Sequence, residues 1–537
     1  MLLEMLLLKR GYMKIFIVLF VILLTLLCIG TLFAESYFWV DSQIAPKWCS
    51  FYVFGGFLIF LYELVLYKYG NCTTLFAFCI RVFFFIVVIC CSIQAIYGLG
   101  QYFGVWISNM PNFVTGSFDN PVGFAFCLTS ALPIFLYFLI NSKNWVRIIV
   151  LLSICTVVFA IVVSGSRTAI LALFVYVLFL YFYFRKRFKI SFITFAFFIF
   201  LIIVISFIMY CSNEDSVNGR FLIWKCSIEM IKDKPLLGWG TGGFQKVYMY
   251  YQADYFRYNA DDYYSYLADN VKHPFNEFLL IIIEYGLLGL LLVLFFFFIL
   301  IYCGLQKRRK VNSFIFVLIL LSIIVFSCFS YPFMYPFIWI LLIVCAFQLL
   351  DLELLKNIIC KRRIFFVLFI VLFCFYGLWV TGAIAAELKW CHISKRSLLG
   401  ETESVLPYYQ RLGERLSENP FFLYSYAVEL NSSMRYSESI KVLKECESFY
   451  NDYDVKMLQA RNYEKVGDLL QAENYYQLAS RMCPNRFLPL YYLVHLYQSQ
   501  GEEKKAKKIA KKIVEKRVKI NSYIIDTIKN EMKKYIE

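Results

Sequence analysis

The stretch KHPFNEFLLIIIEYGLLGLLL, Lys272 to Leu292, decides the fold, because the apolar run that begins in it continues to Cys303. A helix of roughly 20 mostly apolar residues is long enough to cross the ~30 Å hydrocarbon core of a bilayer. We therefore predict a membrane-spanning helix over Phe278–Cys303, with His273 at its head. The chain has only three histidines, so His273 is of interest as a functional residue. What it can contact depends on the side of the membrane that it faces.

The rest of the chain has the same apolar character. Of its 537 residues, 61% are hydrophobic, 20% are aromatic and only 17% are charged, which leaves too little polar surface for a soluble globule of this size. We predict an all-α fold, a polytopic transmembrane helix bundle of about eleven spans. The expected spans are 15–33, 51–66, 82–99, 122–140, 145–163, 168–184, 190–210, 278–303, 314–330, 337–350 and 364–386. The first is not a cleavable signal peptide, because no small-residue cleavage site follows it.

Basic residues collect in every second loop between the predicted spans, as in RKRFK (Arg185–Lys189) and QKRRK (Gln306–Lys310). Cytoplasmic loops next to membrane helices carry such an excess, so this set and the N-terminus are predicted to be cytoplasmic. The alternate set, which includes residues 211–272 and His273, is then predicted to lie outside. The formal charge of +16 mainly records this topology and a basic C-terminal tail, and no base-stacking module for nucleic acid is visible.

After the last predicted span the sequence becomes charged and helical, and an internal repeat appears. ARNYEKVGDLLQAENYYQLASRMCPN (Ala460–Asn485) and VHLYQSQGEEKKAKKIAKKIVEK (Val494–Lys516) superpose at a spacing of 34 residues, which resembles the tetratricopeptide repeat. We predict a repeat domain over 419–537 that offers a helical surface to a protein partner. A link over 391–418 would join it to a transmembrane domain over 1–390. An irregular helical tail is the alternative.

The outside turn SGSRT places Arg167 between two predicted spans, beside Ser164, Gly165 and Ser166. An arginine at the membrane boundary either anchors the helix by snorkelling or binds an anion. The neighbouring hydroxyls add hydrogen-bond donors and the glycine lets the backbone approach, so both favour the anion site. The pattern thus predicts an oxyanion site at this turn.

The long outside loop contains NGRFLIWKCSIEMIKDKPLLGWGTGGF, Asn218 to Phe244, whose first half predicts a short amphipathic helix on the bilayer surface. Arg220 lies one helical turn before Trp224, so the two side chains are predicted to share a face. The sequence GWGTGG lacks the Gly-Lys-Ser/Thr of a phosphate-binding loop, so Gly238 and Gly240 are predicted to form a turn.

Two carboxylates follow His273 along the predicted span. Glu277 and Glu284 lie four and eleven residues after it, which places all three on nearly the same helix face. Glu284 would lie inside the bilayer, where a carboxylate is costly unless it is paired. A structural role for Glu284, as the partner of a neighbouring helix, is therefore favoured over direct catalysis.

Four of these blocks, taken in order, resemble the signature of the O-antigen ligase and polymerase superfamily: SGSRTAILAL, Arg220 with Trp224, DKPLLGWGTGGF, and HPFNEFLLIIIEYGLLG. The stretch GSFDNPVGFAFCL, which contains Asn120, resembles an upstream block, and the similarity covers roughly residues 100–300. In one departure, Pro274 follows His273 where the family has asparagine, and Asn276 comes later.

Members of this superfamily are inverting glycosyltransferases that move a glycan from an undecaprenyl-pyrophosphate carrier to an acceptor hydroxyl. They act at the outer face of the bacterial cytoplasmic (inner) membrane, without a nucleotide sugar, a metal or another cofactor. The resemblance implies the same reaction, donor and location for this chain, with the C-terminal domain in the periplasm. It leaves the acceptor open between lipid A core, a growing glycan as in a polymerase, and serine or threonine of a protein.

The resemblance also implies roles for the residues singled out above. Planar, permanently charged guanidinium groups suit a diphosphate, so Arg167 and Arg220 are predicted to bind it. His273 either accepts the proton of the acceptor hydroxyl or hydrogen-bonds the diphosphate. Substrate contacts are further predicted for Ser164, Ser166, Trp224, Asn276 and Glu277, and structural roles for Asn120, Gly238, Gly240 and Glu284.

Two other functional classes are consistent with a polytopic chain. A flippase for lipid-linked glycans would bind the same diphosphate, but it should line a transmembrane cavity with charge, whereas the charged residues here gather in outside loops. A scaffold that only presents the repeat domain would not need Arg167, Arg220 and His273 on one side. The sequence therefore favours a transferase in which these three residues form one site.

Overall fold

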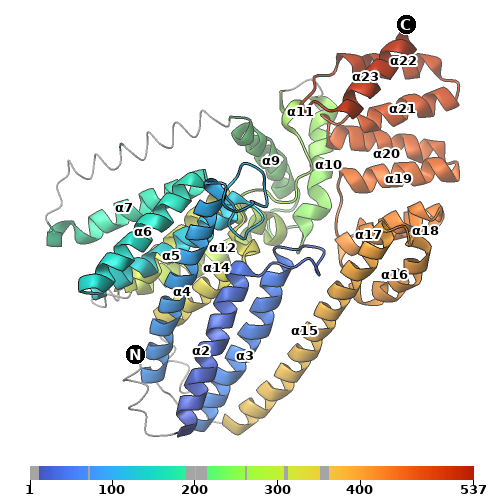
Figure 1. Ribbon diagram of the computed structural model, residues 1–537. Coiled ribbons are helices and arrows are strands. Elements are labelled where there is room, and N and C mark those ends of the chain that lie inside the picture. Colours follow the sequence, from blue (N-terminus) through green and yellow to red (C-terminus); the bar gives the residue numbers. More distant parts are fainter. Residues whose placement is uncertain are drawn as a thin grey trace. The chain divides into compact units, whose positions relative to one another are not determined.

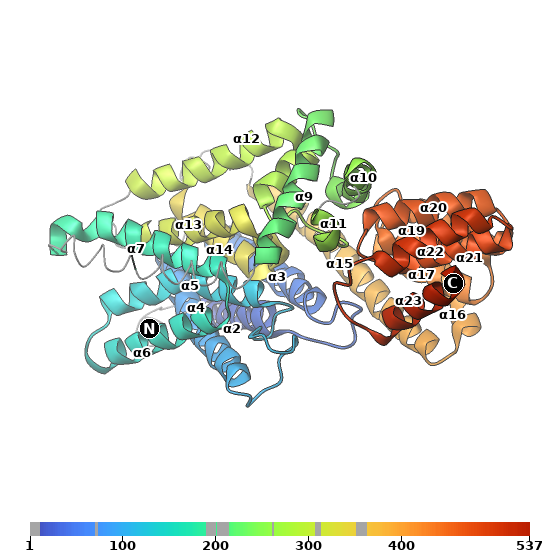
Figure 2. The ribbon, with the colours of Figure 1, turned by 90° about the horizontal axis from the view of Figure 1, so that it is seen from above.

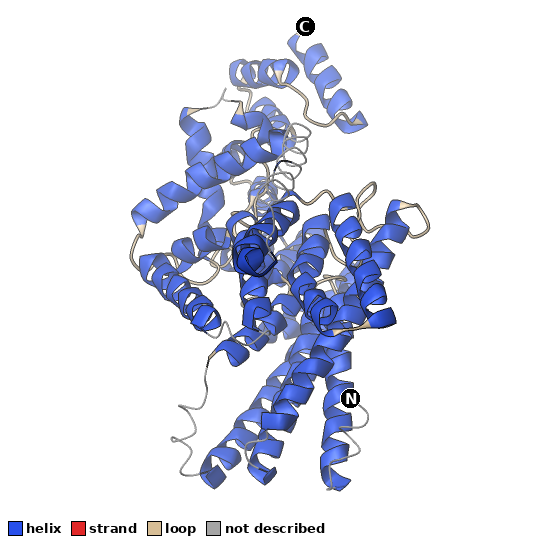
Figure 3. Ribbon diagram, turned by 90° about the vertical axis from the view of Figure 1, so that its left-hand side faces the viewer, coloured by secondary structure: helices blue, strands red, loops and turns tan. Residues whose placement is uncertain are grey.

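The computed structural model describes residues 11–69, 73–188, 214–259, 263–306, 313–350 and 362–537, together with Phe200. Every regular element within these residues is helical, as Figure 3 shows, so the all-α prediction is confirmed for them. The chain divides into two compact units, each built from two separate segments. Unit 1 comprises Met1–Ser212 and Val293–Leu388, and unit 2 comprises Asn213–Leu292 and Lys389–Glu537.

Unit 1 consists of long apolar helices (Figures 1 and 2). They are α2 (Gly11–Phe33), α3 (Ala45–Tyr69), α4 (Thr73–Tyr102), α5 (Pro121–Asn141), α6 (Asn144–Val163), α7 (Arg167–Phe188), α13 (Ser313–Phe329) and α14 (Pro336–Leu349), with the short η1 (Pro332–Met334). Helix α12 (Glu277–Gln306) enters this unit at Val293, and α15 (Arg362–Leu398) leaves it after Leu388.

Ten of the predicted spans fall on helices that the structure describes. Within the described part of the chain, seven helices are long and apolar enough to cross a membrane: Lys14–Phe33, Ala45–Lys68, Ala77–Tyr102, Pro121–Asn141, Asn144–Val163, Glu277–Gln306 and Phe365–Leu398. Three more are shorter apolar helices: Arg167–Tyr183, Ser313–Phe329 and Pro336–Leu349. The span expected at 190–210 lies outside the described residues, apart from Phe200. The class, a multi-pass membrane protein, is thus supported, and the count of about eleven stays a prediction.

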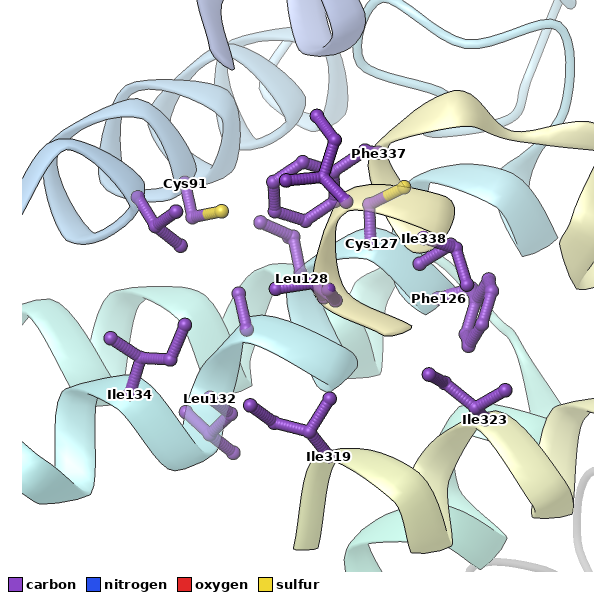
Figure 4. Close-up of a cluster of buried hydrophobic side chains, with 14 of the residues drawn as sticks. Cys91, Phe126, Cys127, Leu128, Leu132, Ile134, Ile319, Ile323, Phe337 and Ile338 are labelled. Carbon is purple, nitrogen blue, oxygen red and sulfur yellow. The ribbon is translucent and has the colours of Figure 1, made fainter. Parts of the chain in front are cut away.

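Helix α5 lies at the centre of unit 1. All residues from Gly123 to Phe135 are buried, as expected of a helix that is apolar on every side and surrounded by other helices. Figure 4 shows the packing around it. Phe126, Cys127, Leu128, Leu132 and Ile134 of α5 lie near Ile319 and Ile323 of α13, Phe337 and Ile338 of α14, and Cys91 of α4. This core holds the ends of the surrounding helices in register.

Polar contacts join three of the predicted outside loops at one end of unit 1. The side chain of Lys47 is fully buried. Its ammonium donates to three backbone oxygens, those of Ala34, Gln43 and Ser117, at 2.9, 3.0 and 2.7 Å. The Trp48 indole donates to the Met334 oxygen at 3.0 Å. The loops after α2, before α5 and between α13 and α14 therefore share one end, as a common side of the membrane requires. A buried amine is tolerated there because each donor has an acceptor.

Unit 2 contains the helices of the long predicted outside loop and all helices after α15. The first group is α9 (Glu214–Asp233), α10 (Gly243–Tyr258), α11 (Tyr264–Leu267) and the first part of α12. The second group is α16 (Thr402–Leu416), α17 (Pro420–Ser432), α18 (Tyr436–Cys446), α19 (Tyr453–Val466), α20 (Leu469–Met482), α21 (Leu488–Ser499), α22 (Glu503–Glu515) and α23 (Tyr523–Ile536). We call α16–α23 the C-terminal array. The predicted link over 391–418 is itself mostly helical, in the end of α15 and in α16.

Successive helices of the C-terminal array pack side by side as hairpins (Figure 1). Positions that the 34-residue spacing pairs are alike in the structure: Ala472 in α20 and Ala506 in α22 are both fully buried. In the preceding hairpin of α17 and α18, Ser439 is also buried, and its hydroxyl donates to the Ala427 oxygen at 2.7 Å. Small residues let neighbouring helices approach closely. The assignment to the tetratricopeptide class stays a prediction.

The predicted outside loop and the C-terminal array share one hydrophobic core. Phe244 and Tyr248 of α10 belong to the same buried cluster as Met482 at the end of α20. Gln252, also fully buried, donates through Nε2 to the Met482 oxygen at 2.6 Å and to the Asp269 oxygen at 3.1 Å. The loop helices therefore fold against the array and not as a separate domain.

Candidate functional site

Helix α9 presents Arg220 and Trp224 to the turn that follows His273. The Trp224 indole donates to the Pro274 oxygen at 3.0 Å, and the Arg220 guanidinium lies over the Phe275 ring, 5.2 Å from its centroid. Residues four apart on a helix are neighbours, which explains why the two side chains reach consecutive residues of the turn. The N–H groups of a guanidinium lie in its plane, in the geometry that suits two-pronged binding of a phosphate.

The other face of α9 fixes this helix to unit 2. Its buried residues are Leu222, Ile223, Cys226, Ser227 and Met230. On the opposite stripe Phe221 and Ile228 are 48% and 50% exposed. The predicted amphipathic helix is therefore present, with apolar side chains left at its surface. Its contact with a bilayer stays a prediction.

The turn after His273 has an unusual backbone. Phe275 has a φ of 54°, in the left-handed region, which costs a bulky residue about 1 kcal/mol or more. The contacts from Arg220 and Trp224 hold this conformation in place. Strain of this kind gathers at functional sites, where surrounding contacts fix it.

His273 is half-buried, and burial lowers its pKa to about 4, with a further contribution from Lys272. The imidazole is therefore neutral at neutral pH. A neutral imidazole carries one nitrogen that accepts a proton or a hydrogen bond. The region thus combines a permanent cation, Arg220, with a neutral base.

Helix α12 begins directly after this turn. The side-chain oxygen of Asn276 accepts from the Leu279 N–H at 2.9 Å, as a helix N-cap does. Glu277 is buried in the first turn, where a carboxylate is favoured by the helix dipole. Both residues therefore help to start α12, and their predicted contact with substrate stays a prediction.

Helix α12 is broken at Gly286, whose φ is 66°. In a continuous helix the oxygens of Ile283 and Glu284 would accept from the N–H groups of Leu287 and Leu288. All four groups pair instead with the glycine-rich stretch before α10. The N–H groups of Trp239 and Gly240 donate to Ile283 and Glu284 at 2.8 and 2.9 Å, and those of Leu287 and Leu288 donate to the oxygens of Pro235 and Leu236 at 2.9 and 3.4 Å. The break thus leaves none of these four backbone groups without a partner.

This pairing brings two backbones so close that only glycine fits. Gly238 has a φ of 69°, and a Cβ built there would lie 2.5 Å from the Ile283 oxygen. A Cβ at Gly286 would lie 2.0 Å from the Leu236 oxygen. The sequence GWGTGG is therefore a turn, as predicted, and it is shaped by the break in α12.

Glu284 also contacts this turn. Its carboxyl group lies near the backbone N–H groups of Gly242 and Phe244, at the start of α10. Unpaired N–H groups and the dipole at a helix N-terminus both favour a negative charge. Glu284 thus joins α12 to α10, and Gly240 bonds to its backbone oxygen.

Sequence reasoning missed two residues, Asp269 and Asn270, that lie four and three positions before His273. Asp269 accepts from the Arg486 guanidinium at 2.8 Å, and Asn270 bonds to the first turn of α19. The polar pair beside the histidine was visible in the sequence. Its partners were not, because they lie in the C-terminal array.

Arg167 and its neighbouring serines belong to unit 1. Arg167 is the first residue of α7 and is half-buried. The Ser164 hydroxyl donates to the Ile161 oxygen at 2.6 Å, and the Ser166 hydroxyl accepts from the Ala169 N–H at 3.4 Å. Both serines thus close the turn between α6 and α7. Their contact with substrate stays a prediction, as does a common site for Arg167 with the residues of unit 2.

Asn120 has a structural place in unit 1. Its side-chain oxygen caps α5 by accepting from the Gly123 N–H at 2.8 Å. Its amide nitrogen donates to the hydroxyls of Tyr331 and Tyr335 at 3.1 and 2.8 Å. Asn120 therefore ties the start of α5 to the loop between α13 and α14.

Fold and site together define a class, a multi-pass membrane protein with a cation and a neutral histidine at the start of a span. Within this class, residues 149–294 match the family model described as O-antigen ligase. The matched region contains Arg167, Arg220 and His273. A comparison with curated proteins gave no match. The family match supports a role in membrane glycan transfer during polysaccharide assembly. Among the residues that the structure describes, no group of His, Cys, Asp and Glu has the arrangement of a metal site.

Proposed function

We propose that this protein is an inverting glycosyltransferase that moves a glycan from undecaprenyl pyrophosphate to an acceptor hydroxyl. The observation that supports the proposal is a pair of contacts from α9, in which Trp224 and Arg220 hold the turn after His273. This turn lies inside the region that matches the O-antigen ligase model. Arg220 thus contacts the turn that directly follows the neutral imidazole of His273. These are the two groups that such a transfer needs, a cation for the diphosphate and a base for the hydroxyl.

In the proposed reaction the acceptor oxygen attacks the anomeric carbon of the donor from the face opposite the diphosphate. The bond between that carbon and the diphosphate oxygen breaks, and undecaprenyl diphosphate leaves with the electron pair. The proton of the hydroxyl passes to His273. Arg220 and Arg167 bind the diphosphate and stabilise the negative charge that it gains, where positive charge lowers the barrier most.

The low pKa of His273 keeps the imidazole neutral at neutral pH, which is the form that can accept a proton. A neutral imidazole accepts the hydroxyl proton, whereas a cationic ligand of the diphosphate would have to be protonated before the donor binds. The acceptor then determines the biological product. Lipid A core, a second lipid-linked glycan and a serine or threonine of a protein all present the hydroxyl that this chemistry uses.

The test uses the full chain in lipid nanodiscs, with an undecaprenyl-pyrophosphate glycan as donor and each of the three acceptors in turn. We expect one acceptor to gain the glycan. Arg220→Lys keeps the charge but loses the planar pair of donors, so transfer should fall at least about tenfold. His273→Ala should abolish most turnover. Arg257→Lys, on the exposed side of α10, is the matched control and should leave transfer unchanged.

Two outcomes would contradict the proposal. One is wild-type transfer in Arg220→Lys and His273→Ala at normal protein abundance. The other is a wild-type protein that binds the donor but passes its glycan to none of the three acceptors.

A further inference from the structure

The segment that carries His273 is held from both sides within unit 2. After the histidine, Trp224 and Arg220 of α9 contact Pro274 and Phe275. Before it, most anchors come from the C-terminal array, and α10 adds two, one of which is the Gln245 amide that donates to the Lys272 oxygen at 3.4 Å. Asp269 binds Arg486 at 2.8 Å, Lys272 lies over the Phe421 ring at 5.1 Å, the Leu267 oxygen accepts from Lys519 at 3.3 Å, and Gln252 of α10 donates to the Asp269 oxygen.

Asn270 makes the most specific of these contacts. Its side-chain oxygen accepts from the Tyr453 N–H at 3.0 Å. Its amide nitrogen donates to the carboxylates of Asp452 and Asp454 at 3.2 and 3.0 Å. The amide thus uses both its acceptor and its donor on the first turn of α19. No other side-chain type of this size offers both functions at these positions.

The contact is built into the start of α19. The first N–H groups of a helix have no partner within the helix. Asp452 caps one of them, the Val455 N–H, at 2.8 Å, and Asn270 satisfies a second, that of Tyr453. The neutral amide also separates two carboxylates. Burial, followed by the neighbouring Asp452, raises the pKa of Asp454, so a further negative charge here would be unfavourable.

The geometry points to the C-terminal array as a working part of the transfer site, which positions His273 through Asn270. This inference rests on the proposed function and extends it, because it makes Asn270 a positioning residue of the reaction. His273 is the third residue after Asn270, so the chain between them spans at most about 10 Å. With α9 holding the following residues, His273 lies between two fixed points.

Release of one fixed point should displace the imidazole. A displacement of about 1 Å can lower the rate up to about a hundredfold, even when the altered residue does not touch the substrate. The donor-binding guanidinium of Arg220 belongs to α9 and keeps its own support. Loss of the Asn270 contact should therefore reduce kcat more than it raises the KM for the donor.

The test compares Asn270→Asp with the matched control Asn431→Asp, in the full chain in nanodiscs. Asn270→Asp removes the amide donor and adds a charge beside Asp452 and Asp454. Asn431 instead donates to Asn462 at 2.6 Å, within the array. We expect Asn270→Asp to lower kcat at least about tenfold with a donor KM within about threefold of wild type. Asn431→Asp should leave both unchanged.

Rescue by a charge swap separates positioning from general damage. In Asn270→Asp with Asp454→Asn, a neutral amide again faces a carboxylate, and kcat should return to within about threefold of wild type. Amide hydrogen exchange of residues 267–275 gives a second readout that needs no substrate. It should accelerate in Asn270→Asp, and not in Asn431→Asp or in the swapped protein.

Three results would overturn the inference: wild-type kcat and exchange in Asn270→Asp, equal losses in Asn270→Asp and Asn431→Asp, or no rescue by the swap. If Asn270→Asp cannot be purified, Arg486→Gln replaces it, since the ion pair with Asp269 is half-exposed and its loss spares the core. Wild-type exchange at 267–275 in that variant would also overturn it. A wild-type protein without transfer refutes the proposed function alone, because the exchange comparison still decides the positioning.

Discussion

At His273 the surroundings decide which protonation state the protein uses. Its pKa falls to about 4 because burial disfavours the charged imidazolium, and the ammonium of Lys272 acts in the same direction. The folded protein therefore binds a proton at this position only below about pH 4. An exposed histidine would do so below about pH 6.5.

We expect the acid limb of kcat/KM for glycan transfer to fall near pH 4, and not near pH 6.5, because kcat/KM reports the ionisation of the free enzyme. Initial rates from about pH 3 to pH 8, with the donor below its KM, measure this. Lys272→Gln removes a neighbouring positive charge, so it should move the limb to higher pH. An acid limb near pH 6.5 in the wild type would mean that His273 is not buried in the working enzyme.

Local spacing predicted some of the residue-scale geometry and could not predict the rest. The common direction of Arg220 and Trp224 follows from a separation of one helical turn. The contact of Asn270 with Tyr453 joins residues 183 positions apart, so no local sequence pattern predicts it. The left-handed backbone of Phe275 likewise depends on the α9 contacts around it.

At the scale of elements, helix α12 has a break at Gly286 that its hydropathy does not reveal. The apolar run after Phe278 predicts one continuous span, and the break at Gly286 changes no side-chain pattern. A helix interrupted in its middle is stable only if its freed backbone groups find other partners. The stretch Pro235–Gly240 supplies them. The break and the turn are thus one structure made from two distant pieces of chain.

Gly286→Ala should destabilise unit 2 strongly, because the added Cβ would meet the Leu236 backbone at 2.0 Å and the φ is positive. We expect a loss of about 3 kcal/mol or more, against about 1 kcal/mol for Gly240→Ala, which also has a positive φ but open space around it. Thermal unfolding in detergent, followed by protease resistance of residues 214–259, compares the two variants. Equal stability of both would contradict the close pairing.

At the scale of the whole molecule, the long loop and the C-terminal array fold into one unit, which the sequence did not predict. The long loop and the C-terminal array were predicted as parts of different domains, because Val293–Leu388 lies between them in the chain. Their union depends on buried contacts between α10 and α20, and the hydropathy of each segment alone does not reveal a partner. The prediction of helices in both segments needed no such knowledge, since their periodicity is local.

Ending the chain after Gly400 should therefore unfold the long loop as well. The truncation removes Met482 and other apolar residues that cover Phe244 and Tyr248. We expect residues 214–259 to lose protection from amide exchange, while α5 in unit 1 keeps it. A chain that ends after Ser522 and lacks only α23 is the control and should retain protection in the loop. Full protection of the loop in the shorter chain would contradict a shared core.

The shared core also determines whether the number of membrane crossings between the long loop and the C-terminal array is even or odd. The described residues between Glu214 and Asn276, which precede α12, fold together with the residues from Lys389, so both lie on one side of the bilayer, however many spans precede them. The chain between them must cross an even number of times. Helices α12 and α15 are each long enough to cross, so the short helices α13 and α14 either both cross or both turn back. The pair therefore acts as one topological element. A homologue that lost only one of them would carry its C-terminal array on the opposite side from its histidine.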